Sequence, residues 1–208
     1  MTFGIPLEKC AAHLVMGLWW RYAETCHLVQ IFGEKMLPRT TFALGGAASG
    51  KSEWAEALVN SSGMSKTYLA TGRIWDDEVQ ERVNKHQARR DAGWRTVECP
   101  LDLTEPLAKL PAGEIVLIDC ATMWLSNHLM EGSDLEAAQA QLLQALRGCA
   151  AYWIVVSNEV GQGIVPENAM ARQFREAQGR LNIALAAEAE TVVQVVVGLP
   201  QLLKGEMP

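Results

Sequence analysis

The chain has few of the features that mark secreted or metal-binding proteins. Its five cysteines are widely spaced, odd in number and never arranged as C-x-x-C. This distribution predicts reduced thiols in a cytoplasmic protein, because disulfide frameworks and zinc sites need paired or clustered cysteines. No internal repeat, low-complexity tract or linker interrupts the 208 residues, so we expect one main domain.

Positive charge and long apolar runs are also scarce. The net charge of −6 argues against nucleic acid as a partner, because binding a phosphate backbone needs a basic face. The apolar stretch from Ala11 to Trp20 is broken by His13 and is too short to span a bilayer. It also lacks the cationic start and the cleavage site of a secretory signal. We therefore expect a cytoplasmic protein without a membrane span.

The first 35 residues stand apart from the rest of the chain. Apolar residues recur there at helical spacing, at Leu7, Ala11, Leu14, Leu18 and Tyr22. Two interpretations remain open: an appended amphipathic helix, or an upstream start assigned in error, with translation beginning at Met36. The second is favoured because a strand-first α/β unit begins just after Met36. The expected organisation is an N-terminal extension over 1–35 and a nucleotide-binding domain over 36–208.

The most informative motif is G-x-x-x-x-G-K-[ST]. It comprises Gly45, Gly46, Ala47, Ala48, Ser49, Gly50, Lys51 and Ser52. A strand-like run precedes it and helix-forming residues follow, which distinguishes a phosphate-binding P-loop from a glycine-rich turn without a ligand. Glycines let backbone N–H groups turn toward a polyphosphate, and the following helix presents its own N–H groups to the same anion. Lys51 would reach the β- and γ-phosphates, and the Ser52 hydroxyl would bind Mg²⁺.

Strands and helices alternate from residue 40 onward. Predicted strands cover 41–44, 66–70, 95–99, 114–120, 152–157 and 191–197. Predicted helices cover 49–60, 76–90, a segment from about 121, 134–148 and 167–190. This order predicts an α/β fold of the P-loop NTPase (RecA-like) class, with a mostly parallel, doubly wound sheet flanked by helices. Ligands are expected at the carboxyl ends of its strands.

Two further segments lie at predicted strand ends. Asp119 ends a buried strand, where a Walker-B carboxylate would hold Mg²⁺; the alternative is an N-cap for the next helix. The segment 157–161 follows another strand. Its polar groups would contact nucleotide or acceptor, or only shape the turn, and composition leaves both roles open.

The predicted helix 76–90 carries a candidate nucleophile. Arg82, His86 and Arg90 are spaced by four residues and so share one helix face. Two guanidiniums beside an imidazole disfavour its protonation, and the neutral imidazole is the nucleophilic form. The alternative is an ordinary solvated helix surface. The run 84–87 is not a guanine-reading N-K-x-D motif, because Gln87 lacks the carboxylate.

Together these motifs resemble the bifunctional adenosylcobinamide kinase/adenosylcobinamide-phosphate guanylyltransferase family of cobalamin assembly. The likeness spans about residues 40–204. The matching residues lie at 45–52, 68–71, 76–78, 82–86, 90, 94–98, 117–120, 157–166, 179–182, 199–200 and 202–204. The specific part is the combination of a P-loop, an Arg-x-x-x-His helix and Asn-Glu-Val-Gly-x-Gly-Ile-Val-Pro.

This resemblance implies two reactions that use GTP, ATP and Mg²⁺. A nucleoside triphosphate phosphorylates adenosylcobinamide, and Lys51 serves this step. A histidine, by motif position His86, then takes GMP from GTP and passes it to adenosylcobinamide phosphate. The resemblance also implies a homo-oligomer, with a trimer expected. Beyond the P-loop, it assigns nucleotide contacts to Ala70, Thr71, Gly72, Gln87, Ala88, Arg89, Arg90, Glu98 and Asp119.

One position departs from the family pattern. Many members carry arginine inside the P-loop where this chain has Ala48. The missing cation bears on the kinase reaction more than on the guanylyl step, and Arg73 and Arg89 are candidate substitutes. The choice between ATP and GTP as phosphate donor stays open. Two rival hypotheses are a kinase without a covalent intermediate and a nucleotide-dependent regulator without turnover.

Overall fold

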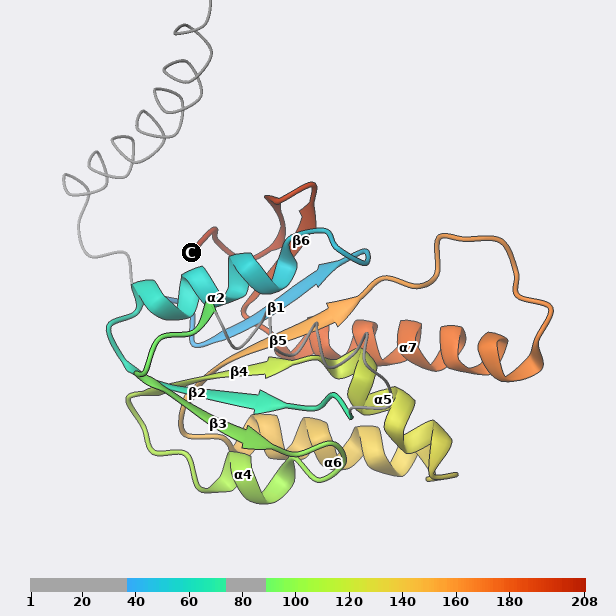
Figure 1. Cartoon of the computed structure of the whole chain (residues 1–208), viewed down its shortest axis with the longest axis horizontal. Coiled ribbons are helices and arrows are strands. Elements are labelled where there is room, and N and C mark those ends of the chain that lie inside the picture. The colour runs from blue at the N-terminus through green and yellow to red at the C-terminus, as the bar shows by residue number, and fades with distance from the viewer. Residues whose placement is uncertain (1–36, 74–88) are drawn as a thin grey trace, which may run out of the picture. The chain divides into compact units, whose positions relative to one another are not determined.

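A central β-sheet organises the chain. The computed structural model describes residues 37–73 and 89–208, and within them a seven-stranded sheet runs in the order β3-β2-β4-β5-β1-β6-β7 (Figure 1). Its strands are β1 (Thr40–Gly45), β2 (Ser65–Ala70), β3 (Trp94–Glu98), β4 (Glu114–Asp119), β5 (Tyr152–Asn158), β6 (Thr191–Val196) and β7 (Leu199–Lys204). Each neighbouring pair is parallel except β6 and β7. The predicted mostly parallel sheet is confirmed.

Helices cover both faces of this sheet (Figure 1). The described helices are α2 (Lys51–Ser61), α4 (Thr104–Ala108), α5 (Ala121–Met130), α6 (Leu135–Gly148) and α7 (Ala169–Glu188). Helix α2 packs on one face through Ala55 and Val59, and α4 to α7 pack on the other face. None of the described helices is long and apolar enough to cross a membrane.

The sequence of β4 shows how the two faces are filled. Val116 and Ile118 belong to the core beneath α4 to α7, whereas Ile115 and Leu117 face α2. Successive side chains of a strand point to opposite faces, so a strand covered on both sides must be apolar throughout. These four residues are at most 1% exposed. The continuous apolar run in the sequence is therefore a direct consequence of the doubly covered sheet.

The described strands and helices lie close to their predicted ranges, with two additions. Helix α4 is short, and β7 is an exposed edge strand that includes Pro200. Proline lacks a backbone N–H, so its presence argues against a strand in the sequence. An edge strand tolerates it, because one side of that strand forms no ladder hydrogen bonds. Most of the predicted helix 76–90 and all of the extension 1–35 lie outside the described residues. The two-part division of the chain stays a prediction.

Candidate functional site

The P-loop connects β1 to α2 in a tightly constrained path. Gly50 has a φ of 91°, in the left-handed region that favours glycine. A Cβ on Gly45 would lie 2.6 Å from the carbonyl oxygen of Val195, so that position has no room for a side chain. Gly50 is also the N-cap of α2, and no side chain caps this helix. The first N–H groups of α2 therefore lack a side-chain cap, as a phosphate-binding loop requires.

Lys51 folds back across this loop. Its Nζ donates a hydrogen bond to the carbonyl oxygen of Gly46 at 2.9 Å, and the residue is 8% exposed. Ser52 follows it in the first turn of α2 and is 9% exposed. The loop thus connects a strand to a helix, as the motif predicts, and Lys51 is the first residue of that helix. Nothing in the structure tests their contacts with nucleotide, which stay predictions.

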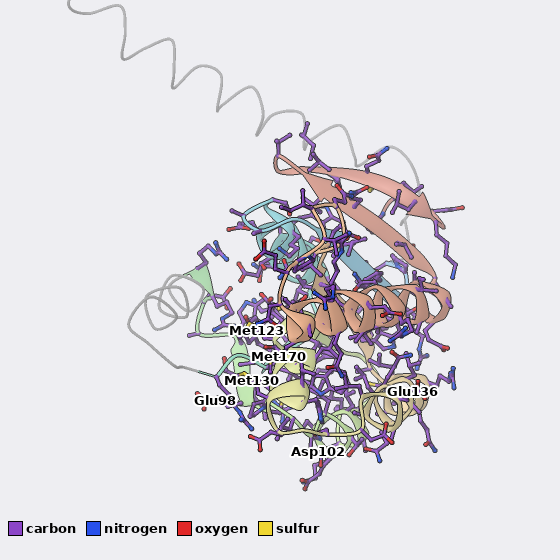
Figure 2. All side chains as sticks on the ribbon, turned by 90° about the vertical axis from the view of Figure 1, so that its right-hand side faces the viewer. Glu98, Asp102, Met123, Met130, Glu136 and Met170 are labelled. Atoms are coloured by element: carbon purple, nitrogen blue, oxygen red, sulfur yellow. The ribbon has the colours of Figure 1, made fainter. Side chains whose placement is uncertain are left out.

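The strands next to the P-loop place other predicted residues at the same sheet edge. Ala70 stands opposite Glu98 on one side and Asp119 on the other, and Gly45 stands opposite Asn158. Figure 2 looks at this edge, where the parallel strands end, and shows Glu98 there. The carboxyl ends of the strands therefore gather the P-loop with residues that are distant in the sequence.

Asp119 does not cap the helix that follows it. The N-cap of α5 is Cys120, and no side chain forms a capping hydrogen bond there. Burial raises the pKa of the Cys120 thiol to about 11; the charge of Asp119 adds to this rise and that of Lys51 opposes it. Asp119 and Lys51 therefore both lie near enough to the Cys120 thiol, just after β4, for their charges to affect it. The capping alternative for Asp119 is therefore not seen, and its metal-side role stays a prediction.

Thr71 uses its hydroxyl inside the protein. The hydroxyl donates to the Cys120 carbonyl oxygen at 2.8 Å and accepts from the Cys120 N–H at 2.7 Å. The residue is 0% exposed, and Asn127 donates to its carbonyl oxygen at 2.8 Å. Thr71 thus ties the end of β2 to the segment after β4. Its predicted contact with nucleotide would have to come from elsewhere than this hydroxyl.

In the segment 157–161, hydrogen bonds shape the turn, and one buried polar atom has no partner among the described residues. Ser157 donates to Asn182 at 2.7 Å and accepts from Gln178 at 2.9 Å, while the Asn158 N–H donates to Thr122 at 2.8 Å. These bonds fix the end of β5 against α5 and α7. The Asn158 Oδ1, by contrast, is buried without a hydrogen-bond partner among the described residues. Sequence reasoning did not single out Thr122 or Gln178, whose partners are far away in the chain.

Two arginines at the end of the predicted helix 76–90 contact α2 and β2. Arg89 forms ion pairs with Glu53 and with Glu56, the latter at 3.0 Å. The Arg90 guanidinium lies 3.5 Å from the centre of the Tyr68 ring. Its Nη1 is buried and has no hydrogen-bond partner within the described ranges.

The candidate substitutes for the missing P-loop arginine are both held by carboxylates. Arg73 pairs with Glu131 at 2.5 Å, and Arg89 pairs with the two glutamates of α2. Ala48 has a φ of 53°, so the loop also places this position in the left-handed region. The role of either arginine as a substitute for a cation at position 48 stays a prediction.

Three predicted residues, His86, Gln87 and Ala88, lie outside the described residues, as does Arg82. The structure therefore does not test the proposed nucleophile. Its closest described neighbours in the sequence are Arg89 and Arg90.

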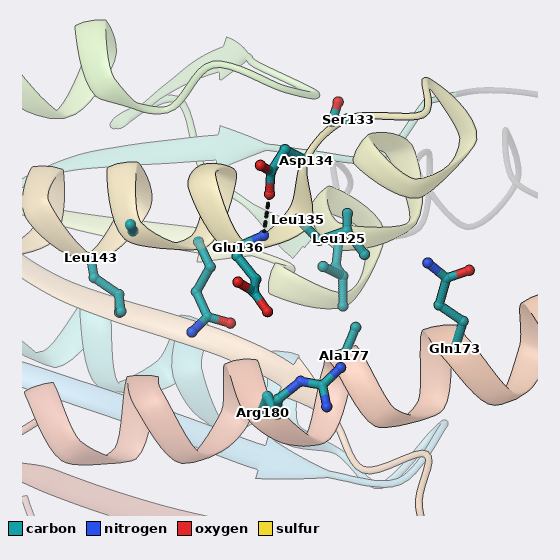
Figure 3. A pocket seen from close by; sticks show the side chains of 11 residues that line it. Leu125, Ser133, Asp134, Leu135, Glu136, Leu143, Gln173, Ala177 and Arg180 are labelled. Atoms are coloured by element: carbon teal, nitrogen blue, oxygen red, sulfur yellow. Dashed lines mark hydrogen bonds between the residues drawn. The ribbon is translucent and has the colours of Figure 1, made fainter.

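A separate hollow of about 620 Å³ lies between α6 and α7, with Leu125 of α5 on its wall (Figure 3). Leu143 and Ala177 give it an apolar surface, and Arg180 lies at its rim. No residue of the P-loop and none of the strand-end residues described above lines it. We therefore do not assign this hollow to the nucleotide site.

Comparison with known proteins identifies the family. Residues 41–203 match the family model described as cobinamide kinase / cobinamide phosphate guanyltransferase. The chain is 42% identical over 166 residues to the bifunctional adenosylcobalamin biosynthesis protein CobP of Pseudomonas aeruginosa, covering 78% of this chain and 96% of that protein. It is 40% identical over 176 residues to the bifunctional adenosylcobalamin biosynthesis protein CobU of Escherichia coli K12, covering 77% and 97%.

Solved structures confirm the fold class. The chain resembles the type III secretion ATPase EscN of enteropathogenic E. coli, with a TM-score of 0.52 and 10% identity, covering 76% of this chain and 43% of EscN. A second type III secretion ATPase gives the same TM-score and identity, covering 79% of this chain and 57% of the ATPase. The chain spans about half the length of these ATPases, and at this identity the likeness concerns the RecA-like P-loop fold alone. By its sequence match, the chain belongs to the cobinamide kinase / cobinamide phosphate guanyltransferase family, whose members act in adenosylcobalamin biosynthesis.

Proposed function

We propose that the chain phosphorylates adenosylcobinamide and then transfers GMP from GTP to the product, through a guanylylated His86, giving adenosylcobinamide-GDP. The observation that supports this best is the uncapped P-loop at the strand edge, with Lys51 folded across it, in a chain that matches the family model over residues 41–203. The proposal extends the family assignment to named residues and to a covalent intermediate.

The triphosphate would bind between the P-loop and the start of α2. Backbone N–H groups of the loop and of the uncapped helix would donate to its phosphate oxygens. Lys51 would exchange its bond to the Gly46 carbonyl oxygen for the β- and γ-phosphates. The buried Ser49 Oγ and Asn158 Oδ1, which lack hydrogen-bond partners in the described part of the chain, would gain partners from a bound ligand.

Ser52 and Asp119 fit a bound Mg²⁺. A hydroxyl and a carboxylate are the oxygen donors that this hard cation prefers, and phosphate oxygens and water would complete its shell. Among the residues that the structure describes, no group of three His, Cys, Asp or Glu side chains could hold a metal ion. When bound, Mg²⁺ would neutralise charge on the phosphates.

The two reactions differ in the bond that breaks. In the kinase step, the adenosylcobinamide hydroxyl attacks the γ-phosphorus, loses its proton and releases a nucleoside diphosphate. In the first half of the guanylyl step, the neutral imidazole of His86 attacks the α-phosphorus of GTP and releases pyrophosphate. The phosphate oxygen of adenosylcobinamide phosphate then attacks the same phosphorus and frees His86. Only the second reaction needs a histidine nucleophile.

The family resemblance also supports a proposal on cellular location and assembly. We propose a cytoplasmic homo-oligomer, with a trimer as the expected state. Size-exclusion chromatography coupled to light scattering measures the number of subunits directly.

A product assay tests the function and separates it from its rivals. The purified protein is incubated with adenosylcobinamide, Mg²⁺ and either ATP or GTP, and the nucleotide products are separated by chromatography. We expect a nucleoside diphosphate first and then pyrophosphate when GTP is present. A diphosphate without any pyrophosphate would support the simple kinase instead, and nucleotide binding without turnover would support the regulator.

A further inference from the structure

Tyr68 occupies a place that the proposed mechanism does not explain. It lies on β2, faces α2 and is 6% exposed. One face of its ring carries the Arg90 guanidinium, 3.5 Å from the ring centre. Trp94 meets the ring edge-on, with 6.3 Å between centroids. The tyrosine is thus fixed between the sheet, a tryptophan and a cation.

Tyr68 has Asp119 as a neighbour on the adjacent strand. Tyr68 stands opposite Leu117 of β4, and Asp119 lies two residues further along the same strand, hence on the same face. Diagonal neighbours on adjacent strands lie within reach of a tyrosine side chain, and the Tyr68 hydroxyl interacts with the Asp119 carboxylate. A phenol hydroxyl is a hydrogen-bond donor and a carboxylate is an acceptor, so the two groups are complementary.

Arg90 stacks on the Tyr68 ring but still has a hydrogen-bond donor available for a ligand. Its Nη1 is buried and lacks a hydrogen-bond partner in the described residues. Buried guanidinium groups normally form several hydrogen bonds, so this nitrogen is suited to a phosphate oxygen. Arg89, next to it, is pinned to Glu53 and Glu56 of α2. Adjacent residues are thus attached to two different elements around the P-loop.

We propose that Tyr68 is a positioning residue for nucleotide binding: its ring face holds the Arg90 guanidinium, and its hydroxyl holds the Asp119 carboxylate. Through these two contacts it sets the distance between a phosphate-binding cation and the carboxylate on the metal side. The inference rests on the proposed function in one respect, namely that both groups serve a bound nucleotide. A purely structural tyrosine would need only the ring, because the cluster around it is apolar.

Variants of Tyr68 separate its two contacts. Tyr68→Phe keeps the ring and removes the hydroxyl, whereas Tyr68→Leu removes both. We measure GTP dissociation constants by titration calorimetry with and without Mg²⁺. Tyr68→Phe should stay within about twofold of wild type without Mg²⁺ but should raise the Mg²⁺ concentration for half-maximal binding about threefold or more, since a charge-assisted hydrogen bond is lost. Tyr68→Leu should weaken GTP binding about fivefold in both conditions.

Coupling to Arg90 gives the sharper readout. Arg90→Ala should weaken GTP binding about tenfold, and Tyr68→Leu combined with Arg90→Ala should be no weaker than Arg90→Ala alone, because the tyrosine ring acts through the arginine. Tyr152→Leu and Tyr152→Phe, at the opposite end of the sheet, are matched controls and should leave GTP binding unchanged. If Tyr68→Leu does not fold, Tyr68→Met replaces it.

Two results would overturn the inference. One is full additivity of the Tyr68→Leu and Arg90→Ala effects. The other is a Tyr68→Phe variant as impaired without Mg²⁺ as Tyr68→Leu. These readouts use GTP binding and not the covalent step. A wild-type protein that binds GTP but forms no guanylylated intermediate would contradict the proposed function and still leave the Tyr68 coupling measurable.

Discussion

At the scale of single residues, the candidate site is built from buried polar side chains. Lys51 and Ser52 are almost fully buried at the start of α2, and Lys51 bonds to Gly46. The Thr71 hydroxyl joins the end of β2 to the segment after β4 through two hydrogen bonds to Cys120. Such groups keep their positions before a ligand arrives, so little reorganisation is needed on binding.

Replacing Lys51 tests the loop most simply. Lys51→Ala removes the cation that would face the β- and γ-phosphates, so both phosphoryl transfer and guanylyl transfer should fall by on the order of 10²–10³ in kcat. Steady-state rates of diphosphate and pyrophosphate release measure this. Lys109→Ala, which removes an exposed lysine of an i,i+4 pair, is the control. Unchanged GTP affinity and rates in a folded Lys51→Ala protein would disprove the P-loop assignment.

Two buried thiols give a second prediction at this scale. Burial raises the pKa of Cys120 to about 11, and burial and Asp102 raise that of Cys99 to about 12. The thiolate is the reactive form, so at pH 8 both cysteines should resist iodoacetamide in the native protein and react once it is unfolded. Peptide mass mapping checks this. Rapid native labelling of either thiol would contradict the described core.

At the scale of elements, side chains cap two of the described helices, α6 and α7. Asp134 caps α6 by accepting from the N–H groups of Glu136 and Ala137 at 3.0 and 3.1 Å, and the first of these bonds is drawn in Figure 3. Asn168 caps α7 in the same way through Ala171. Only α2, among these three, begins at a glycine without a cap. Helices α4 and α5 also lack a side-chain cap, so α2 is distinguished by the P-loop glycine at its start, which has a φ of 91°.

The cap of α6 can be tested by stability. Asp134→Ala should lower the free energy of unfolding by about 1 kcal/mol, because two N–H groups lose their acceptor. Urea denaturation measures the loss. Glu136→Ala changes a charge in the same helical turn without removing a cap and should cost at most about 0.5 kcal/mol. Equal losses in the two variants would show that the Asp134 bonds contribute nothing specific.

The elements also show what the sequence can and cannot predict. Apolar strands such as β4 and the P-loop are local patterns, and they were predicted with nearly correct bounds. Helix α4 has only five residues, and β7 has six exposed residues, so neither carries a clear periodic signal. The Tyr68–Arg90 contact and the Thr71–Cys120 bonds join residues that are distant in the chain. Such partners depend on strand order, which local patterns do not encode.

At the scale of the whole molecule, the sheet brings the site together. The order β2-β4-β5-β1 places the ends of four parallel strands side by side, and these ends carry Ala70, Asp119, Asn158 and Gly45. Every described strand of this sheet lies at or beyond Thr40. The site described here thus belongs to the domain that matches the family model.

The N-terminal segment gives a prediction at this scale. A protein that begins at Met36 should have the same melting temperature and the same activity as the full chain, because every described strand lies beyond that residue. Differential scanning calorimetry and the product assay compare the two proteins. A clear fall in melting temperature, or a change in subunit number, would show that residues 1–35 are a working part of the fold.

The central claim is that GMP passes through His86, and one labelling measurement tests it most directly. Wild-type protein is incubated with Mg²⁺ and GTP labelled separately at the α- and γ-phosphates, and its intact mass is recorded. We expect a mass increase of one GMP residue that retains the α-label, loses the γ-label, survives base and is released by acid, as a phosphoramidate is.

The matched variants complete this measurement. His86→Ala should lose the adduct while still binding GTP through the P-loop, and His13→Ala, in the N-terminal extension, should keep it. An α-labelled adduct in His86→Ala, or no adduct in wild type under turnover conditions, would contradict the guanylyl-transfer mechanism proposed for this chain.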